Sequence, residues 1–158
     1  MAESGNALAC RARDCGFKSR PELSSDKMKT RFVPVGIVKH SDKILIIKRG
    51  MNNRTSPGKW GYPSGCLKEF ENAEDGILRE IKEETGLEVK ILKKGKIFEV
   101  EDNDVSWIVL TFLCESGSEK VTVDMDETTD HRWIKPEEIK NYDMVPGAEK
   151  DLKVVGLL

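Results

Sequence analysis

The chain has 158 residues, of which 34% are charged and 38% hydrophobic, and its formal net charge is −2. This length and balance predict one folded domain with a core large enough to hold a cleft, and they exclude a disordered chain. The weakly acidic charge argues against general nucleic-acid binding, and no apolar run reaches the roughly 18–20 residues of a membrane span, so we expect a cytoplasmic protein.

The first 27 residues show neither strand alternation nor helical periodicity over any useful length. We therefore expect residues 1–27 to form a loosely ordered N-terminal extension and residues 28–158 to form the folded domain. The chain has four cysteines, Cys10, Cys15, Cys66 and Cys114. Only the first two are close in sequence, which gives half a metal site, so free thiols in a reducing compartment are the favoured interpretation.

Two β-branched-rich runs at 31–40 and 43–50 begin the expected domain, separated by the polar residues Ser41 and Asp42. This pattern predicts a hairpin of buried strands. A loop rich in turn residues follows at 51–65. A loop of this length inside a compact domain is more often functional than idle.

Residues 72–85 are predicted to form a helix. Asn72 is a suitable N-cap, and Asp75 supports the first turn three residues later. An apolar stripe at helical spacing follows, formed by Ile77, Leu78 and Ile81. Gly86 suits the left-handed position at which such a helix ends.

The second half of the chain is predicted to continue the sheet and to add helical segments. We expect strands at 87–102, 105–116 and 130–136, and helices at 136–142 and 147–158. The run at 105–116 is nearly continuous in apolar residues, which indicates a central strand. Strands interleaved with helices predict an α/β fold, an α/β/α sandwich with a mixed β-sheet.

Three glutamates, Glu80, Glu83 and Glu84, fall on one face of the predicted helix because their spacing is i, i+3 and i+4. Like charges at this spacing cost about 0.2–0.5 kcal/mol each, and Arg79 stands where it should pair with only one of them. Mg²⁺ would relieve the repulsion because it takes carboxylate oxygens and keeps waters that a phosphate can displace. A solvated acidic helix face explains the same three residues, so the glutamates alone leave both interpretations open.

The residues on either side of the glutamates extend the pattern. Gly65 is followed after five residues by Glu71, and after seven more by the run from Arg79 to Leu87. This arrangement resembles the Nudix box, G-x5-E-x7-R-E-U-x-E-E-x-G-U with U aliphatic, and every specified position is met. A chance match anywhere in such a chain is on the order of one in a million or less. The segments "LIIKRG", "GKWGYPSG" and "DHRWIKPEEI" also resemble the family, so the resemblance spans about residues 31–152.

The resemblance implies hydrolysis of a nucleoside diphosphate linked to another moiety, by attack of a metal-activated water on a phosphoanhydride. It implies Mg²⁺ as the cofactor, with Mn²⁺ as a substitute, bound by Glu80, Glu83, Glu84 and the carbonyl of Gly65. Glu83 is the expected main ligand. Arg79 would orient the glutamates by pairing with Glu71 or Glu83.

The resemblance leaves the general base open. In many relatives it is an acid on a later loop, just before an Arg-Trp pair like Arg132-Trp133. The candidates on that loop are Asp126, Glu127 and Asp130, of which we favour Glu127. In other relatives a glutamate of the box does this work, so Glu83 and Glu84 remain alternatives.

Residues that flank the loop are expected to contact the substrate. Arg49 and Lys59 are the predicted phosphate contacts. Three aromatic residues, Phe32, Trp60 and Trp107, could stack on a base, although aromatics in this fold are more often part of the core. Ser64 and Phe70 replace glycines of the usual family pattern and Lys68 replaces an acid, so we expect an altered loop over the site with the metal positions intact.

The compact size resembles the MutT-type branch of the family, so a (d)NTP pyrophosphohydrolase acting on a small nucleotide is the favoured function. One alternative is an ADP-ribose or nucleotide-sugar diphosphatase. Many ADP-ribose hydrolases have a proline at the position of Asn103, so this residue argues against the alternative. A non-catalytic nucleotide-sensing module is a second alternative, and the complete box argues against it. RNA decapping is disfavoured by the charge, and a homodimer is left open.

Overall fold

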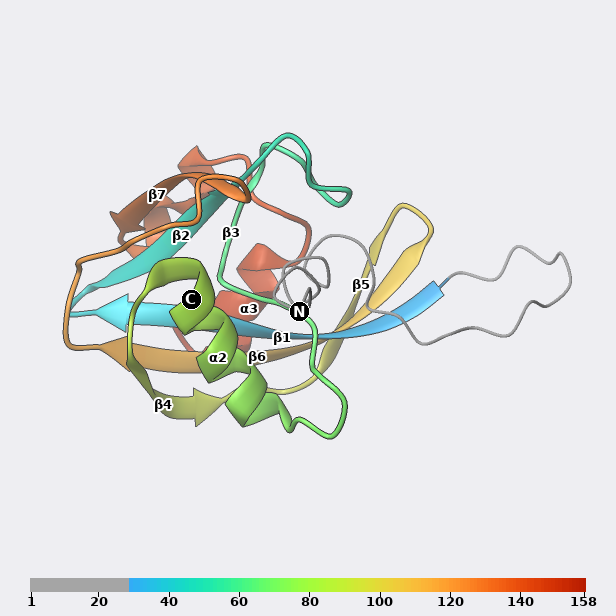
Figure 1. The fold of residues 1–158 in the computed structure, drawn as a ribbon, viewed down its shortest axis with the longest axis horizontal. Coiled ribbons are helices and arrows are strands. Elements are labelled where there is room, and N and C mark those ends of the chain that lie inside the picture. The colour runs from blue at the N-terminus through green and yellow to red at the C-terminus, as the bar shows by residue number, and fades with distance from the viewer. Residues whose placement is uncertain (1–28) are drawn as a thin grey trace, which may run out of the picture.

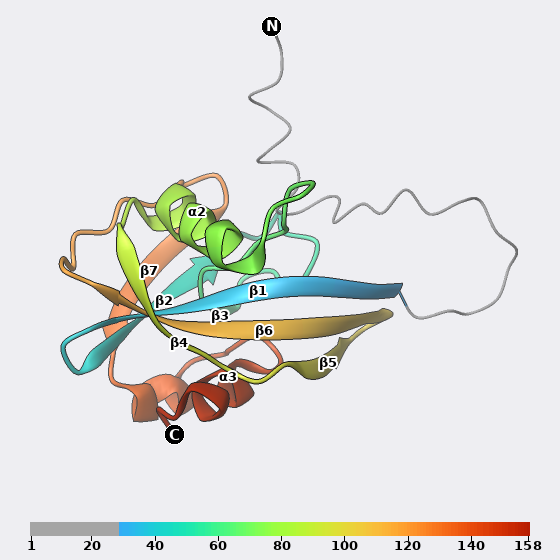
Figure 2. The same ribbon diagram turned by 90° about the horizontal axis from the view of Figure 1, so that it is seen from below.

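A seven-stranded mixed sheet lies between two helices in the computed structural model, which describes residues 29–158 (Figures 1 and 2). The predicted extension at 1–27 lies outside the described residues. The strands are β1 Lys29–His40, β2 Lys43–Arg49, β3 Trp60–Gly61, β4 Val89–Lys94, β5 Phe98–Asp102, β6 Val105–Ser116 and β7 Thr128–Ile134. The helices are α2 Ala73–Thr85, the short 3-10 helix η1 Pro136–Asn141, and α3 Ala148–Val155.

The sheet has the order β3-β2-β1-β6-β4, with β5 paired to β6 and β7 paired to β2. The β1–β6 pair is parallel, and the other strand pairs are antiparallel. Figure 2 shows α2 on one face of these strands and α3 on the other. The predicted α/β/α sandwich with a mixed sheet is therefore confirmed, and so is the interior position of β6.

The hairpin of β1 and β2 is confirmed, with His40 opposite Lys43 across the turn. Ser41 takes a left-handed φ of 55° there. The loop at 51–65 contains β3, in which Gly61 pairs with Ile47 of β2. This pairing ties the middle of the loop to the sheet, so the segment leading into α2 starts from a fixed point.

The boundaries of α2 match those expected from its capping residues. The Asn72 side chain accepts a hydrogen bond from the Asp75 amide at 2.8 Å, and Gly86 ends the helix with a φ of 70°. Ile77 and Ile81 are fully buried against the sheet. Gly36 of β1 lies so close that a Cβ there would be 2.6 Å from Ile81 Cδ1. The helix therefore packs almost directly on the backbone of β1.

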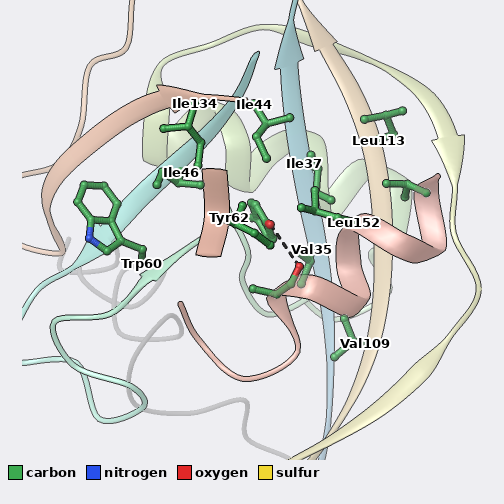
Figure 3. Close-up of a cluster of buried hydrophobic side chains, with 13 residues drawn as sticks. Val35, Ile37, Ile44, Ile46, Trp60, Tyr62, Val109, Leu113, Ile134 and Leu152 are labelled. Carbon is green, nitrogen blue, oxygen red and sulfur yellow. Dashed lines mark hydrogen bonds between the residues drawn. The ribbon is translucent and has the colours of Figure 1, made fainter. Parts of the chain in front are cut away.

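The two faces of the sheet carry separate apolar layers, because successive side chains of a strand point to opposite faces. Along β6, Leu110 and Phe112 pack in the layer under α2, whereas Val109 and Leu113 pack in the layer under α3. Figure 3 shows the second layer, in which Leu152 of α3 contributes to the same cluster. No described helix is long and apolar enough to cross a membrane.

Three expectations differ from the structure. The predicted strand at 87–102 is two strands, β4 and β5, and the predicted helix at 136–142 is the 3-10 helix η1. Cys114 is a free thiol whose pKa burial raises to about 12, whereas Cys66 is disulfide-bonded, so the expectation of free thiols is wrong for Cys66. Spacing along the chain does not determine which sulfurs meet in space. Cys10 and Cys15 lie outside the described residues.

Candidate active site

The loop before α2 touches the helix at Gly65. A Cβ at this position would lie 2.2 Å from Cδ of Glu80, whose side chain is almost completely buried. No other residue type fits here without moving the glutamate. Gly65 and Glu80 are therefore held in direct contact, which brings the backbone of the loop against the helix that carries the carboxylates.

Arg79 connects the loop to the helix through its whole guanidinium group. Its Nε and Nη2 donate to the two carboxylate oxygens of Glu71 at 2.7 and 2.8 Å. Nη1 donates to Glu80 at 2.6 Å and to Glu83 at 3.2 Å, and Nη2 also donates to the carbonyl of Cys66 at 3.0 Å. The expectation that Arg79 pairs with only one glutamate is wrong, because five N–H donors in a rigid fork can serve several acceptors.

These contacts shift the pKa values of both partners. Hydrogen bonds from Arg79 lower the pKa of Glu71 to about 2, and the hydrogen bond to Glu71 raises that of Arg79. The Glu71 side chain is only 14% exposed. Glu71 and Arg79 therefore form a charged, bidentate link between the loop and α2 that stays ionised through the physiological range.

The three box glutamates lie in different surroundings. Glu80 and Glu84 are buried, and Glu84 accepts a hydrogen bond from the Ser64 amide at 3.1 Å. Glu83 lies at the edge of this face with 34% of its side chain exposed. Among the described residues, no three Asp, Glu, His or Cys side chains are arranged as a metal-binding group. The donor set does fit a hard divalent cation, since it consists of carboxylate oxygens beside a loop whose glycine admits no side chain.

A cavity of about 150 Å³ opens beside this face. One part of its wall is polar and includes Arg49, Gly65, Glu84 and Glu127. Another part is apolar and comes from β1, β5 and β6, with the side chains of Val33, Val35, Phe98, Val100, Trp107 and Val109. Asp151 of α3 also lines the cavity. One hollow therefore joins Glu84, the box glutamate in its wall, to an apolar chamber.

The two predicted phosphate contacts are in different places. Arg49 lines the cavity, and its guanidinium donates to the carbonyl and hydroxyl oxygens of Thr55 at 2.9 and 3.0 Å. Burial lowers the pKa of Arg49, and the nearby carboxylates of Glu84 and Glu127 act against that shift. Lys59 is not part of the cavity wall, and its ammonium lies 3.5 Å from Asp143. The structure brings Arg49, but not Lys59, to the site.

The three loop acids considered as general base are also separated by the fold. Glu127 lines the cavity, and its backbone carbonyl accepts hydrogen bonds from the Gly50 amide at 2.8 Å and the Asn53 side chain at 3.2 Å. Asp126 is exposed, and Asp130 lies 3.4 Å from Arg132 outside the cavity wall. The favoured residue, Glu127, is thus the one beside the cavity, and its role stays a prediction.

Of the three aromatic residues considered for stacking, Trp107 lines the cavity. Trp60 packs edge-on against Tyr142, with ring centroids 5.3 Å apart, and Phe32 packs in the layer under α2. Sequence reasoning missed Phe98, which lines the cavity with Val100 and Asp102. The alternation in "FEVED" was the available signal, since it puts these three side chains on one face of β5.

Comparisons with known proteins find relatives that match most of this chain. The chain is 25% identical over 142 residues to the nucleoside triphosphatase NudI of Escherichia coli O17:K52:H18, covering 83% of this chain and all of that protein. It is 27% identical over 143 residues to the NudI protein of Escherichia fergusonii, with the same coverage. A MutT protein structure from Methanosarcina mazei Go1 superposes with a TM-score of 0.68 at 23% identity, covering 79% of this chain and 91% of that chain.

The family assignment follows from the extent of the match as well as from the box. The family model described as the NUDIX domain matches residues 30–153, which include every strand from β2 to β7 and the helix α2 that carries the box. The MutT structure shares the same fold, with helices on a mixed sheet. The chain belongs to the Nudix family of hydrolases.

Proposed function

We propose that this Nudix hydrolase is a nucleoside triphosphate pyrophosphohydrolase, which converts its substrate to a nucleoside monophosphate and pyrophosphate. The cavity carries this proposal, because it joins Glu84 on the acidic face of α2 to an apolar chamber suited to a base. The names of the relatives at 25–27% identity, which are nucleoside triphosphatases, support the same substrate class. A polar end for phosphates and an apolar end for a ring are what such a substrate requires.

The proposal includes Mg²⁺, with Mn²⁺ as a substitute, held by the box glutamates and a loop carbonyl. The donors would be Glu80, Glu83, Glu84 and the carbonyl of Gly65. A bound divalent cation supplies charge neutralisation on the polyphosphate and lowers the pKa of a bound water. Arg79 acts as a positioning residue, since it holds Glu80 and Glu83 while its own position is fixed by Glu71.

The other polar residues of the cavity take the remaining roles. Arg49 binds phosphate oxygens with the guanidinium that now contacts Thr55. Water adds to a phosphorus atom, the bridging P–O bond breaks, and the bridging oxygen leaves with the pyrophosphate. Glu127 takes the proton that the water gives up. Glu83 or Glu84 would take it in the alternative mechanism, which is distinguished by the pH–rate profile of a Glu127→Gln variant.

The experiment that tests this function is product analysis on a panel of nucleotides with Mg²⁺. Pyrophosphate and a monophosphate from a triphosphate substrate are the expected products. Two monophosphates from ADP-ribose or a nucleotide sugar, with triphosphates untouched, would contradict the proposal in favour of a diphosphatase. Tight binding of a nucleotide without any product would favour a sensing module.

A further inference from the structure

Asp151 is a buried carboxyl group in the cavity to which the proposed chemistry assigns no role. Its side chain lines the cavity although the residue is only 5% exposed. The hydroxyl of Thr111 on β6 donates to Oδ1 at 2.5 Å. Among the described residues, no second donor reaches the carboxylate and no lysine or arginine pairs with it. One oxygen of Asp151 is therefore left for a group that enters the cavity.

Packing alone does not explain an aspartate at this position. Burial raises its pKa to about 7, because a charge in apolar surroundings is disfavoured. The neighbouring Tyr62 gives no compensation, since its hydroxyl donates to the carbonyl of Ala148 at 3.2 Å. Figure 3 draws this hydrogen bond as the dashed line from Tyr62. An asparagine would keep the hydrogen bond from Thr111 without the charge. The carboxylate destabilises the fold at neutral pH, so a binding role is the better explanation.

The apolar chamber of the cavity that Asp151 lines has the chemistry for a flat ring. Its walls are the aromatic side chains of Phe98 and Trp107 and the aliphatic side chains of Val33, Val35 and Val109. A heterocycle in this chamber would gain contact with the walls, and any hydrogen bond to its edge would be formed out of water, where it is strongest.

We propose that Asp151 is the residue that determines base specificity, its carboxylate accepting hydrogen bonds from the N–H donors of a guanine-type base. This inference rests on the proposed function, which places the phosphates toward Arg49 and Glu84. An ionised carboxylate only accepts hydrogen bonds. The edge of guanine carries two adjacent donors, an amino group and a ring N–H. Adenine and cytosine place a ring acceptor beside their amino group, and that acceptor would face the carboxylate unfavourably.

Calorimetric titration of GMP and AMP at pH 8.5 tests this assignment. The wild type is expected to bind GMP about 10- to 100-fold more tightly, the range for a hydrogen bond to a charged group. Asp151→Asn should abolish most of the preference for GMP. In one orientation the Asn side chain would turn its NH2 group toward the N–H donors of guanine, and in the other it would offer a neutral oxygen, which is a weaker acceptor than a carboxylate. Glu149→Gln, an exposed position on the same helix, is the matched control and should keep the preference.

The wild type alone provides a second test that needs no variant. As the pH falls from 8.5 to 5.5, Asp151 gains a proton and the ratio of GMP to AMP affinity should fall. Titration of the nucleotide phosphate affects both ligands equally and cancels in the ratio. The groups that face Asp151 from β6 and the loop before α2 are the Thr111 hydroxyl and the Tyr62 phenol, whose pKa is raised, so neither titrates in this range.

Several outcomes would overturn the inference. They are equal affinities in the wild type, no measurable binding of either monophosphate, and a GMP preference that Asp151→Asn retains. A uniform loss of affinity for both ligands in the variant would indicate a structural role instead. Binding requires no turnover, so these results are independent of the proposed function, whose failure would appear as the absence of pyrophosphate from every triphosphate.

Discussion

At the scale of single residues, the site depends on carboxylates whose positions are fixed by contacts with Arg79. Arg79 contacts Glu71, Glu80 and Glu83, so part of the repulsion expected between the box glutamates is offset within the protein itself. The same contacts fix where the carboxylates lie before any ligand arrives. Preorganised charge of this kind favours rapid catalysis, because no reorganisation is needed when the substrate binds.

Glu71→Gln is expected to destabilise the protein by about 2 kcal/mol at pH 7, because it weakens a charge-assisted bidentate contact. The pKa of Glu71 is about 2 in the folded protein, below its ordinary value of 4.5. Its contribution is therefore fully present above pH 4.5 and is lost as the pH falls toward 2. Urea unfolding at pH 7 and pH 3 should show a smaller difference between variant and wild type at pH 3. The exposed Glu69→Gln is the control and should match the wild type at both values.

Glu83→Gln should reduce turnover by roughly 100-fold or more with Mg²⁺, because it removes a proposed ligand of the cation. Its melting temperature should stay close to that of the wild type, since the side chain is partly exposed. Steady-state kinetics and thermal unfolding measure the two effects. Glu88→Gln, which removes an exposed carboxylate just beyond the helix, should leave turnover unchanged. A wild-type rate in Glu83→Gln would reject the metal assignment.

At the scale of elements, the contact between the loop and α2 sets the geometry of the site. Gly65 and Glu80 meet where a side chain on the loop would collide with the carboxyl group. The helix in turn packs on Gly36 of β1 through Ile77 and Ile81. The packing of α2 on β1 thus fixes the position of the carboxylates, and the contact with Glu80 fixes the position of the loop.

Gly65→Ala is expected to destabilise the protein by about 1–3 kcal/mol and to lower activity strongly, because the new Cβ would displace the buried Glu80. Gly117→Ala is a matched control, since nothing lies within 4 Å of its added Cβ. Urea unfolding and steady-state kinetics on both variants measure the effect. Equal stability and activity in the two variants would show that the loop can move away from the helix without loss.

The local elements could be predicted from the sequence, whereas the cavity could not. Asn72 and Gly86 mark the ends of α2 through interactions within a few residues, and the β1–β2 hairpin is equally local. The spacing of the box likewise predicted that its glutamates share one face of α2, because this depends only on residues close together in the sequence. The cavity instead depends on which strands pair with one another, and the composition of each strand does not determine its partners. Asp151 and Phe98 come to one chamber only through that pairing.

At the scale of the whole molecule, the buried charge of Asp151 makes stability depend on pH. Its pKa of about 7 in the folded protein lies above the ordinary value of 3.8, so the fold binds the proton more tightly than the unfolded chain. The free energy of unfolding should therefore fall as the pH rises from about 4 to 7. Asp151→Asn should be more stable than the wild type by on the order of 2–4 kcal/mol at pH 8. The advantage should disappear below pH 4, and a constant difference in urea unfolding across this range would contradict the assignment.

The parallel pairing of β1 with β6 has a consequence for folding. Lys29 pairs with Val105 and Lys39 with Glu115, so the two strands enclose the loop, α2, β4 and β5 between them in the sequence. A chain leaving the ribosome can form the β1–β2 hairpin and α2 early, but the sheet under the helix stays open until β6 emerges. Closing so long a segment carries an entropic cost that sheet contacts offset only afterwards, which slows folding. The carboxylates of α2 therefore acquire their working surroundings late, after most of the chain has been synthesised.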